Sequence, residues 1–303
     1  MSILIQQKYI HKSPVQNFRN AQLTHIATQV RCAATSPTES TPNLSRFVVE
    51  PAPLGLTPVQ VKTSKAPRPD DPNLKSTWAH RAWVASGCTT VLVSLAKSIE
   101  AAAGSHFWVE PLLAGLAGYI LADLGSGVYH WGIDNYGDAT TPIFGTQIEA
   151  FQGHHKWPWT ITRRQFANNL HALARVITFT VLPLDLFVHD PTQLAFIGSF
   201  SGCIMFSQQF HAWAHSTKSK LPKIVVGLQD LGVLVSRSKH ADHHRQPYNC
   251  NYCIVSGVWN KFLDENKIFE ILEMVLFFQL GVRPRSWSEP SLEWTEESSI
   301  HST

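Results

Sequence analysis

The segment FHAWAH, residues 210–215, and the segment KHADHH, residues 239–244, decide how this chain folds. They hold five histidines, which are His211 and His215 in the first segment and His240, His243 and His244 in the second. Residues three or four apart lie on one face of an α-helix, so each segment can direct its imidazoles at one point. This pattern is typical of a metal site formed where helices meet.

Two further clusters lie upstream. The loop FQGHHKWPW, residues 151–159, supplies His154 and His155. The run DLGSGVYHWGID, residues 123–134, spaces four residues along one helical stripe, namely Asp123, Gly127, His130 and Asp134. One structural zinc needs four ligands, whereas eight clustered histidines suit two metal ions with open positions for a small substrate. Imidazole binds zinc, copper, nickel and iron alike, so the residue types alone leave the metal open. The number of ligands favours a di-iron site that activates O₂, with a di-zinc site as the alternative.

Apolar segments separate these clusters. Four of them approach the roughly 20 residues that a helix needs to cross a bilayer, namely 78–96, 106–129, 169–188 and 193–213. Residues 222–236 are shorter and interrupted by Asp230, which indicates an interfacial or re-entrant helix. The sequence predicts an all-α membrane protein with about four transmembrane helices, plus interfacial helices that carry a histidine-rich dimetal site. The near-neutral mean hydropathy of −0.07 leaves a soluble all-α protein as the alternative.

Four crossings place every histidine cluster on one membrane face, because the second and fourth segments end there and the third begins there. Lysines and arginines gather on the same face. By the positive-inside rule this face corresponds to the cytoplasm, or to the stroma in a plastid.

The chain ends have a different composition. Residues 1–50 are basic and contain Ser and Thr, with Glu39 and Glu50 as their only acids, as expected of a plastid transit peptide. We expect a Pro-rich disordered tether over 51–75, a membrane domain over 76–287 and a polar tail over 288–303. An ordinary disordered N-terminal tail is the alternative to a transit peptide. Beyond Lys65 there are 18 basic and 20 acidic residues, so the folded part gives no support to nucleic-acid binding.

The five cysteines do not form a disulfide framework. Cys88 and Cys203 lie in apolar runs and are interpreted as small buried side chains. Cys250 and Cys253 form a lone CNYC pair, which could be a redox switch or half of a zinc site.

Four motifs together resemble the lipid desaturase family. They are DLGSGVYHWGID, FQGHHKWPWTITRRQF, QQFHAWAH, and LVSRSKHADHH followed by NYCIVSG. The family includes plasmanylethanolamine desaturase and a plant branch of chloroplast palmitate trans-Δ3 desaturases that act on phosphatidylglycerol, which the span 78–287 resembles more closely. The resemblance implies a membrane di-iron oxidoreductase that uses O₂ and electrons from ferredoxin. No nicotinamide or flavin fingerprint occurs in the chain, so the electrons are expected from a separate partner.

The resemblance also assigns site residues. It places the metal ligands at His130, His154, His155, His211, His215, His240, His243 and His244. Asp123, Asp134, Asn169 and Asp230 are expected to hold the second ring nitrogen of these imidazoles, with Asp134 alternatively a ligand. The alternatives to a desaturase are a related lipid hydroxylase and a non-catalytic metal-binding protein of the thylakoid membrane. Because the histidines lie at the ends of the predicted spans, we expect the double bond near the carboxyl end of the acyl chain.

Overall fold

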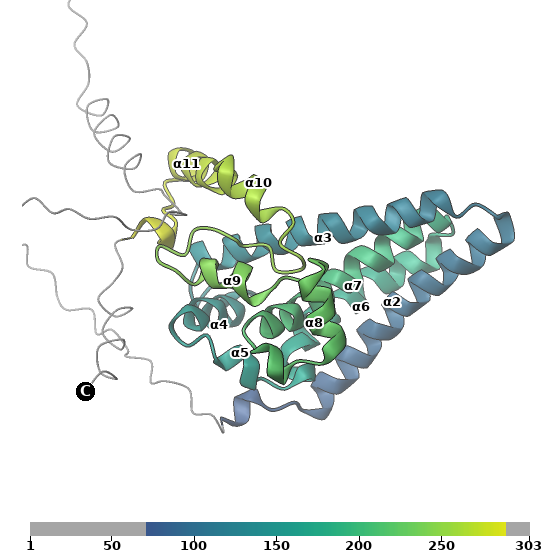
Figure 1. Cartoon of the computed structure of the whole chain (residues 1–303), viewed down its shortest axis with the longest axis horizontal. Coiled ribbons are helices and arrows are strands. Elements are labelled where there is room, and N and C mark those ends of the chain that lie inside the picture. The colour runs from purple at the N-terminus through teal and green to yellow at the C-terminus, as the bar shows by residue number, and fades with distance from the viewer. Residues whose placement is uncertain (1–70, 289–303) are drawn as a thin grey trace, which may run out of the picture. The chain divides into compact units, whose positions relative to one another are not determined.

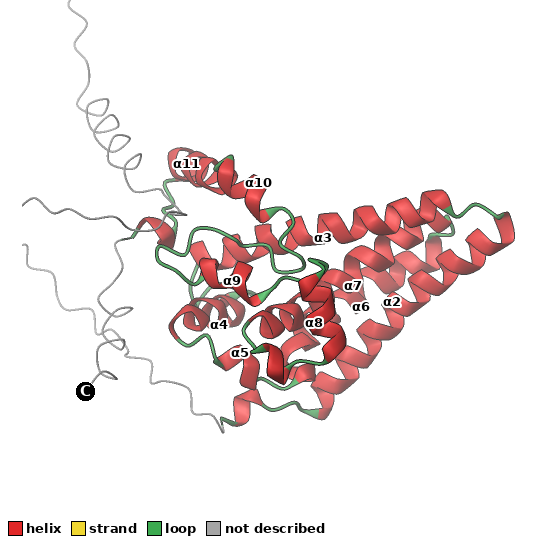
Figure 2. Cartoon of the chain, in the orientation of Figure 1, coloured by secondary structure: helices red, strands yellow, loops and turns green. Residues whose placement is uncertain are grey.

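The computed structural model describes residues 71–288, which belong to one compact unit and contain helices and no strand (Figure 2). Four long helices form an antiparallel bundle (Figure 1). They are α2(Trp78–Ser105), α3(Val109–Asn135), α6(Phe166–Phe187) and α7(Pro191–Ala214). Each long helix overlaps one of the four predicted apolar segments, so the prediction of an all-α bundle is confirmed.

Turn chemistry fixes the reversal between α6 and α7. Asp190 precedes α7 and its Oδ1 accepts a hydrogen bond of 2.8 Å from the Gln193 N–H, while Pro191 occupies the first helical position. A carboxylate at this position satisfies a free N–H of the first turn, and proline lacks an N–H that would need a partner there. The sequence HDPT therefore forms the reversal that was predicted.

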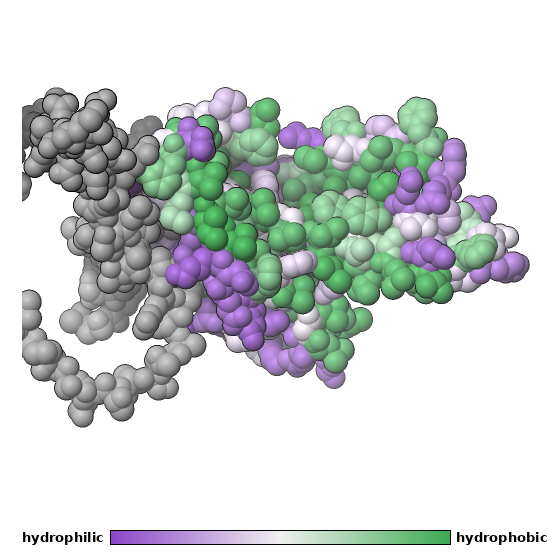
Figure 3. All heavy atoms as spheres, turned by 90° about the horizontal axis from the view of Figure 1, so that it is seen from above, coloured by the Kyte–Doolittle hydropathy of each residue, from purple (hydrophilic) through white to green (hydrophobic). Residues whose placement is uncertain are grey.

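Among the described residues, three stretches are long and apolar enough to cross a membrane. They contain α2, α3 and α6 (Figure 3 shows apolar side chains over much of one face of the bundle). The fourth predicted span, α7, is not among them. The reason lies in its packing, because α7 contacts α2, α3 and α6. A helix surrounded by other helices needs little lipid-facing apolar surface and can carry Ser, Gln and His.

Close approach of backbones holds α7 against α3. A Cβ built on Gly118 would lie 2.8 Å from the Phe196 carbonyl oxygen. A side chain at this position would therefore push the two helices apart. Small residues at helix interfaces are the usual means of close packing in lipid.

Shorter helices lie around one end of the bundle, where α3 and α7 end and α6 begins (Figure 1). They are α4(Gly145–Lys156), α5(Thr160–Arg163), α8(Lys223–Asp230), α9(Arg237–His243), α10(Asn260–Glu265) and α11(Ile268–Leu280), with 3₁₀ turns at Pro72–Leu74, Lys218–Lys220 and Arg285–Trp287. The short helix expected within 222–236 is α8. The sequence interpretation missed α11, which exposes Ile271, Val275 and Leu280. Its 13 residues extend about 20 Å, too short to span a bilayer core of about 30 Å.

The predicted tether is ordered at its C-terminal end. The Gln165 N–H donates to the Leu74 carbonyl at 2.8 Å, and Asn168 Nδ2 donates to the carbonyls of Asn73 and Lys75 at 2.9 and 2.7 Å. Residues 71–75 are therefore part of the folded domain, because the polar groups at the start of α6 bind their backbone. The transit peptide, the rest of the tether and all but the first residue of the polar tail lie outside the described residues.

Candidate metal centre

The eight predicted histidines come together at the end of the bundle, in two groups. Within each group, the ligand atoms lie within 4.8 Å of one another. The first group, called here the five-histidine group, consists of His154, His211, His215, His240 and His244. The second, called here the aspartate group, consists of His130, Asp134, His155 and His243. The groups adjoin, since the rings of His155 and His244 are 4.9 Å apart between centroids.

Nitrogen atoms converge in the five-histidine group. His154 Nε2 lies 2.8 Å from His215 Nε2, which lies 3.2 Å from His211 Nε2. His240 Nε2 and His244 Nε2 are also 3.2 Å apart. Two nitrogens bound at right angles to one metal, with bonds of about 2.1 Å, would lie about 3.0 Å apart. The spacing therefore fits a metal ion held through Nε2 atoms.

One carboxylate oxygen occupies the middle of the aspartate group. Asp134 Oδ2 lies 3.2 Å from His130 Nε2, 3.0 Å from His155 Nε2 and 3.3 Å from His243 Nε2. Asp134 thus lies in the position of a metal ligand and not of a partner for the second ring nitrogen, because it faces the Nε2 atoms of all three rings.

Backbone carbonyls fix the tautomers of two of these rings. His130 Nδ1 lies 2.9 Å from the Tyr252 carbonyl oxygen, and His243 Nδ1 lies 2.7 Å from the Cys250 carbonyl oxygen. A carbonyl only accepts, so each Nδ1 carries the proton and each Nε2 of a neutral ring presents a lone pair to the carboxylate. The lone pairs of His130 Nε2 and His243 Nε2 face the lone pairs of Asp134 Oδ2 at 3.2 and 3.3 Å, and such pairs of acceptors need a cation between them.

Burial disfavours a proton as that cation beside His243. Burial lowers the pKa of His243 to about 4 and that of His215 to about 3, and it also lowers the pKa values of His154 and His240. These rings are neutral at physiological pH, which is the form that binds metals. The chemistry of the donor set therefore fits two bound metal ions.

Two helices supply both groups. On α4, His154 belongs to the five-histidine group and its neighbour His155 to the aspartate group, while α9 divides His240 and His243 in the same way. Adjacent residues of a helix point about 100° apart, so a paired histidine is the simplest way for one helix to serve two metals. This explains the doublet HH in the FQGHHK segment.

Comparison with known proteins identifies the family of the chain. The family model of the lipid desaturase domain matches residues 119–287, more than half of the chain. The chain belongs to the lipid desaturase family. It is 73% identical over 224 residues to fatty acid desaturase 4, chloroplastic, of Arabidopsis thaliana, covering 74% of this chain and 69% of that protein. It is 57% identical to the Arabidopsis fatty acid desaturase 4-like 2, chloroplastic, covering 97% and 100%.

A more distant relative is the plasmanylethanolamine desaturase of Myxococcus xanthus, which is 32% identical over 62% of this chain and 70% of that protein. No solved structure matches the chain. As a lipid desaturase with chloroplast relatives and apolar helices of spanning length, the chain is a membrane oxidoreductase of the chloroplast. The family resemblance seen in the four motifs is confirmed.

Three residues expected beside the histidine rings have other partners in this lipid desaturase. Asp123 lies two helical turns before His130 and accepts from the backbone N–H groups of residues 255–257 and of Trp259. Asn169 Nδ2 donates to the Gln208 carbonyl at 3.0 Å, and exposed Asp230 pairs with Lys218. The acceptors that the sequence interpretation missed are backbone carbonyls, for which side-chain patterns give no signal.

The CNYC pair has a structural position. Cys250 and Cys253 are both buried, and neither belongs to a metal group formed by the described residues. The Cys250 carbonyl holds His243, and a Cβ on Gly127 would lie 2.4 Å from Cys253 Sγ, so this sulfur packs directly on α3. The half-zinc interpretation therefore has no support here.

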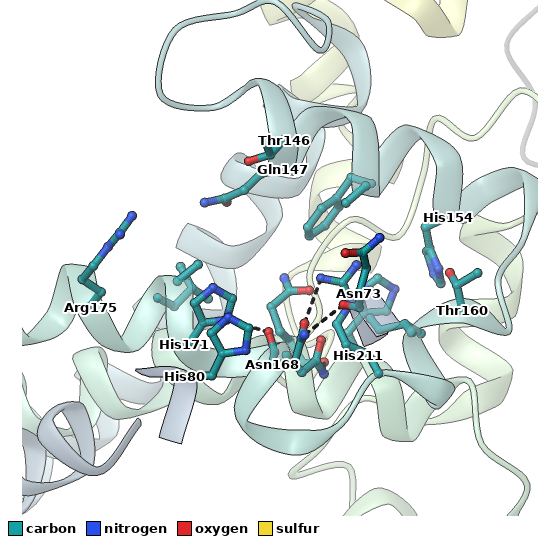
Figure 4. A pocket seen from close by; sticks show the side chains of 18 of the residues that line it. Asn73, His80, Thr146, Gln147, His154, Thr160, Asn168, His171, Arg175 and His211 are labelled. Carbon is teal, nitrogen blue, oxygen red and sulfur yellow. Dashed lines mark hydrogen bonds between the residues drawn. The ribbon is translucent and has the colours of Figure 1, made fainter. Parts of the chain in front are cut away.

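A cavity of about 390 Å³ reaches the five-histidine group. His154 and His211 line it near one side, whereas His80, His171 and Arg175 line it near the other (Figure 4). Asn73 and Asn168 lie between them, joined by a hydrogen bond of 2.9 Å. The size is within the usual range for a small-molecule site, and the cavity gives a ligand access to one of the two groups.

Proposed function

We propose that this desaturase introduces a double bond near the carboxyl end of an acyl chain of phosphatidylglycerol, at the third carbon of palmitate and in trans geometry. Two iron ions and O₂ would serve the reaction. The observation that carries the proposal is the location of both ligand groups at the end of the bundle. The names of the Arabidopsis relatives support a fatty-acyl substrate, and the resemblance of the four motifs supports phosphatidylglycerol.

The ligand groups would hold two irons with different surroundings. The five-histidine group supplies neutral nitrogens alone, whereas Asp134 adds one negative charge to the other group. Bound iron supplies the oxidising power that activates O₂ and removes hydrogen from an unactivated methylene, which acid and base side chains cannot do. No alternative metal is favoured by a specific contact.

The chain's own side chains orient the ligands and exclude water. Phe151 packs against the rings of His130 and His211, with centroid distances of 5.2 and 6.0 Å. Tyr252 packs against His130 and His243 at 5.7 and 5.0 Å. His130 and His243 are both 0% exposed, so bulk water does not contact their rings.

The position along the bundle supports the choice of carbons. His130 and Asp134 lie in the last two turns of α3, and His211 and His215 lie at the end of α7. A lipid held at the membrane boundary would present its first acyl carbons there, with later carbons deeper in a bilayer core of roughly 30 Å. We place this end of the bundle in the stroma, where ferredoxin would deliver the electrons, because basic residues gather at it.

Product analysis tests the proposal. The full chain is expressed together with a plastid ferredoxin system, and the phosphatidylglycerol is analysed for the mass and position of the change. We expect a product two mass units lighter, with a double bond near the carboxyl end, and no product from His211→Ala. A product sixteen units heavier would indicate the hydroxylase alternative, and a bond confined to the middle of the chain would refute the placement.

We also propose residues 1–50 as a plastid transit peptide. Their basic, acid-poor composition and the chloroplast relatives support this. A fluorescent fusion carrying residues 1–65 should enter plastids, and retention in the cytosol would refute the assignment.

A further inference from the structure

The 3₁₀ turn Arg285–Trp287, called here the 285–287 turn, lies against the end of α3 that carries Asp134. The Ser286 N–H donates to Asn135 Oδ1 at 3.0 Å, and Asn135 follows Asp134 directly in the chain. Asn135 is buried, so this hydrogen bond is shielded from water. The turn is therefore fixed to the residue next to a candidate metal ligand.

A buried carboxylate on α11 fixes the other end of the turn. Glu273 Oε2 accepts from Trp287 Nε1 at 2.8 Å, and Glu273 Oε1 accepts from Trp131 Nε1 on α3 at 2.9 Å. The Ser286 hydroxyl also donates to Glu273 Oε1, at 3.3 Å. Buried polar groups that are hydrogen-bonded in this way resist displacement, because each would lose its partner without gaining water. The turn thus has anchors on α3 and α11 that do not involve the side chain of Arg285.

The side chain of Arg285 reaches a third helix, α4. Its Nη1 donates to Gln152 Oε1 at 2.7 Å, and Gln152 is buried. A guanidinium only donates, so it holds Oε1 on its own side and directs the Nε2 of the same amide to the opposite side. There Gln152 Nε2 lies 3.2 Å from the Ile133 carbonyl oxygen and 3.4 Å from the Asp134 carbonyl oxygen. Gln152 therefore joins Arg285 to the last carbonyls of α3.

This connection lies beside the point where α4 meets the aspartate group. Gln152 lies three positions before His155, whose Nε2 is 3.0 Å from Asp134 Oδ2. The backbone of Asp134 is thus bonded to Gln152 while its carboxylate faces His155, so α4 contacts Asp134 twice. If Gln152 lost its orientation, His155 would no longer be held at this distance from Asp134.

The five-histidine group depends less on this contact. One of its members, His154, lies on α4. The other four belong to α7, α9 and the residues that cap these helices, and they are His211, His215, His240 and His244. A small rotation of α4 would therefore disturb one ligand of five there, but would separate His155 from the only carboxylate in the described aspartate group.

We propose that Arg285 is a positioning residue for the aspartate group. By holding Gln152 between the 285–287 turn and the end of α3, it keeps His155 in place beside Asp134. The assignment rests on the two-metal site of the proposed function.

Equilibrium binding of Fe²⁺ tests this role without turnover. The full chain in detergent is equilibrated without O₂ at graded, buffered concentrations of free Fe²⁺, and the bound iron is counted. The wild type should fill two sites, and the site that is missing in Asp134→Asn is the aspartate group. Arg285→Gln should weaken Fe²⁺ binding at that site about tenfold, as is usual when a residue that orients a metal ligand is lost, and leave the other site unchanged.

A double-mutant cycle tests whether Arg285 acts through Gln152. Gln152→Ala should weaken the same site. The variant that carries both Gln152→Ala and Arg285→Gln should bind Fe²⁺ no more weakly than Gln152→Ala alone, because residues that act as one unit are not additive. Arg285→Lys keeps a donor for Gln152 Oε1 and should weaken the site by a smaller factor than Arg285→Gln.

A matched control separates this role from surface charge. Arg283 is exposed two positions before Arg285, and Arg283→Gln should bind Fe²⁺ at both sites as the wild type does. Thermal unfolding checks that each variant is folded. If Arg285→Gln is misfolded, Arg285→Lys takes its place, with a smaller loss expected at the same site.

Three results would overturn the assignment. The first is wild-type Fe²⁺ binding at both sites by the folded Arg285 variant. The second is an equal loss at both sites, which would indicate a general loosening of the fold. The third is an additive loss in the double variant, which would mean that Arg285 acts independently of Gln152. A selective loss at the aspartate group, in a chain whose wild type produces no desaturated lipid, would refute the proposed function and leave the role of Arg285 standing.

Discussion

The substitution Asp123→Asn should destabilise the fold strongly, although Asp123 touches no histidine. Its Oδ1 accepts N–H groups of Val255, Ser256 and Gly257 at 3.1, 2.7 and 2.9 Å, and its Oδ2 accepts that of Trp259 at 3.3 Å. The side chain is fully buried. The same loop carries the carbonyls that orient His130 and His243.

The magnitude follows from the chemistry of these bonds. Hydrogen bonds to a charged group contribute about 1 kcal/mol more than neutral ones, so neutralising the carboxylate weakens the three Oδ1 bonds by about 3 kcal/mol. The amide nitrogen then faces the Trp259 N–H, a second donor, which costs about 1 kcal/mol more. The loss of about 4 kcal/mol corresponds to a decrease of about 10 °C in Tm for a domain of this size.

The assay is thermal unfolding of the full chain in detergent, followed by intrinsic fluorescence, together with the iron content of the purified protein. Glu100→Gln is the control, since Glu100 is exposed near the far end of α2. Iron content should also fall, because the loop no longer holds both rings. A Tm within about 2 °C of the wild type, with full iron content, would refute the reasoning.

Three further predictions follow from particular groups. Asp134→Asn removes the one carboxylate of the two described ligand groups, so iron should fall from two to about one per chain and activity to background; two irons per chain in an active variant would exclude Asp134 as a ligand. Burial raises the pKa of Asp264 from its ordinary value of 3.8 to about 6 in the folded state. The contribution of Asp264 to the free energy of unfolding is therefore fully present below pH 3.8 and is lost as the pH rises through 6. Asp264→Asn should therefore unfold at a higher temperature than the wild type at pH 7.5, and the difference should shrink toward pH 4. Finally, protease added to the stromal side of intact vesicles should not cut residues 106–108, and cleavage there would reverse the proposed orientation.

Sequence reasoning found the ligands because they carry a local signal. Histidines four apart on α7, and the group on α9, reveal a shared face without any tertiary information. The bundle was also predictable, because apolar segments of sufficient length define its helices. The polar composition of α7 is the exception, and its place among three other helices explains it.

Other parts of the site depend on contacts between distant segments. The carbonyls of Cys250 and Tyr252 act through backbone atoms, and any residue type offers a carbonyl. The division of the histidines into two groups depends on how α4 and α9 are rotated, which no spacing rule gives. The cavity is lined by residues of several helices and of the segment before α2, so no single sequence motif could predict it.

The helical stripe of DLGSGVYHWGID shows how one correct pattern can have several functions. Along α3, the first three members of the stripe and the neighbouring Ser126 contact successive parts of one loop in reverse order. Asp123 binds the N–H groups of 255–257, Ser126 Oγ accepts from Ile254, Gly127 makes room for Cys253, and His130 Nδ1 donates to the Tyr252 carbonyl. Only His130 and Asp134 reach the metal groups. The first half of the stripe therefore binds the loop, and its second half supplies His130 and Asp134 to the aspartate group. The residues outside the metal groups hold the loop that keeps His130 and His243 in place.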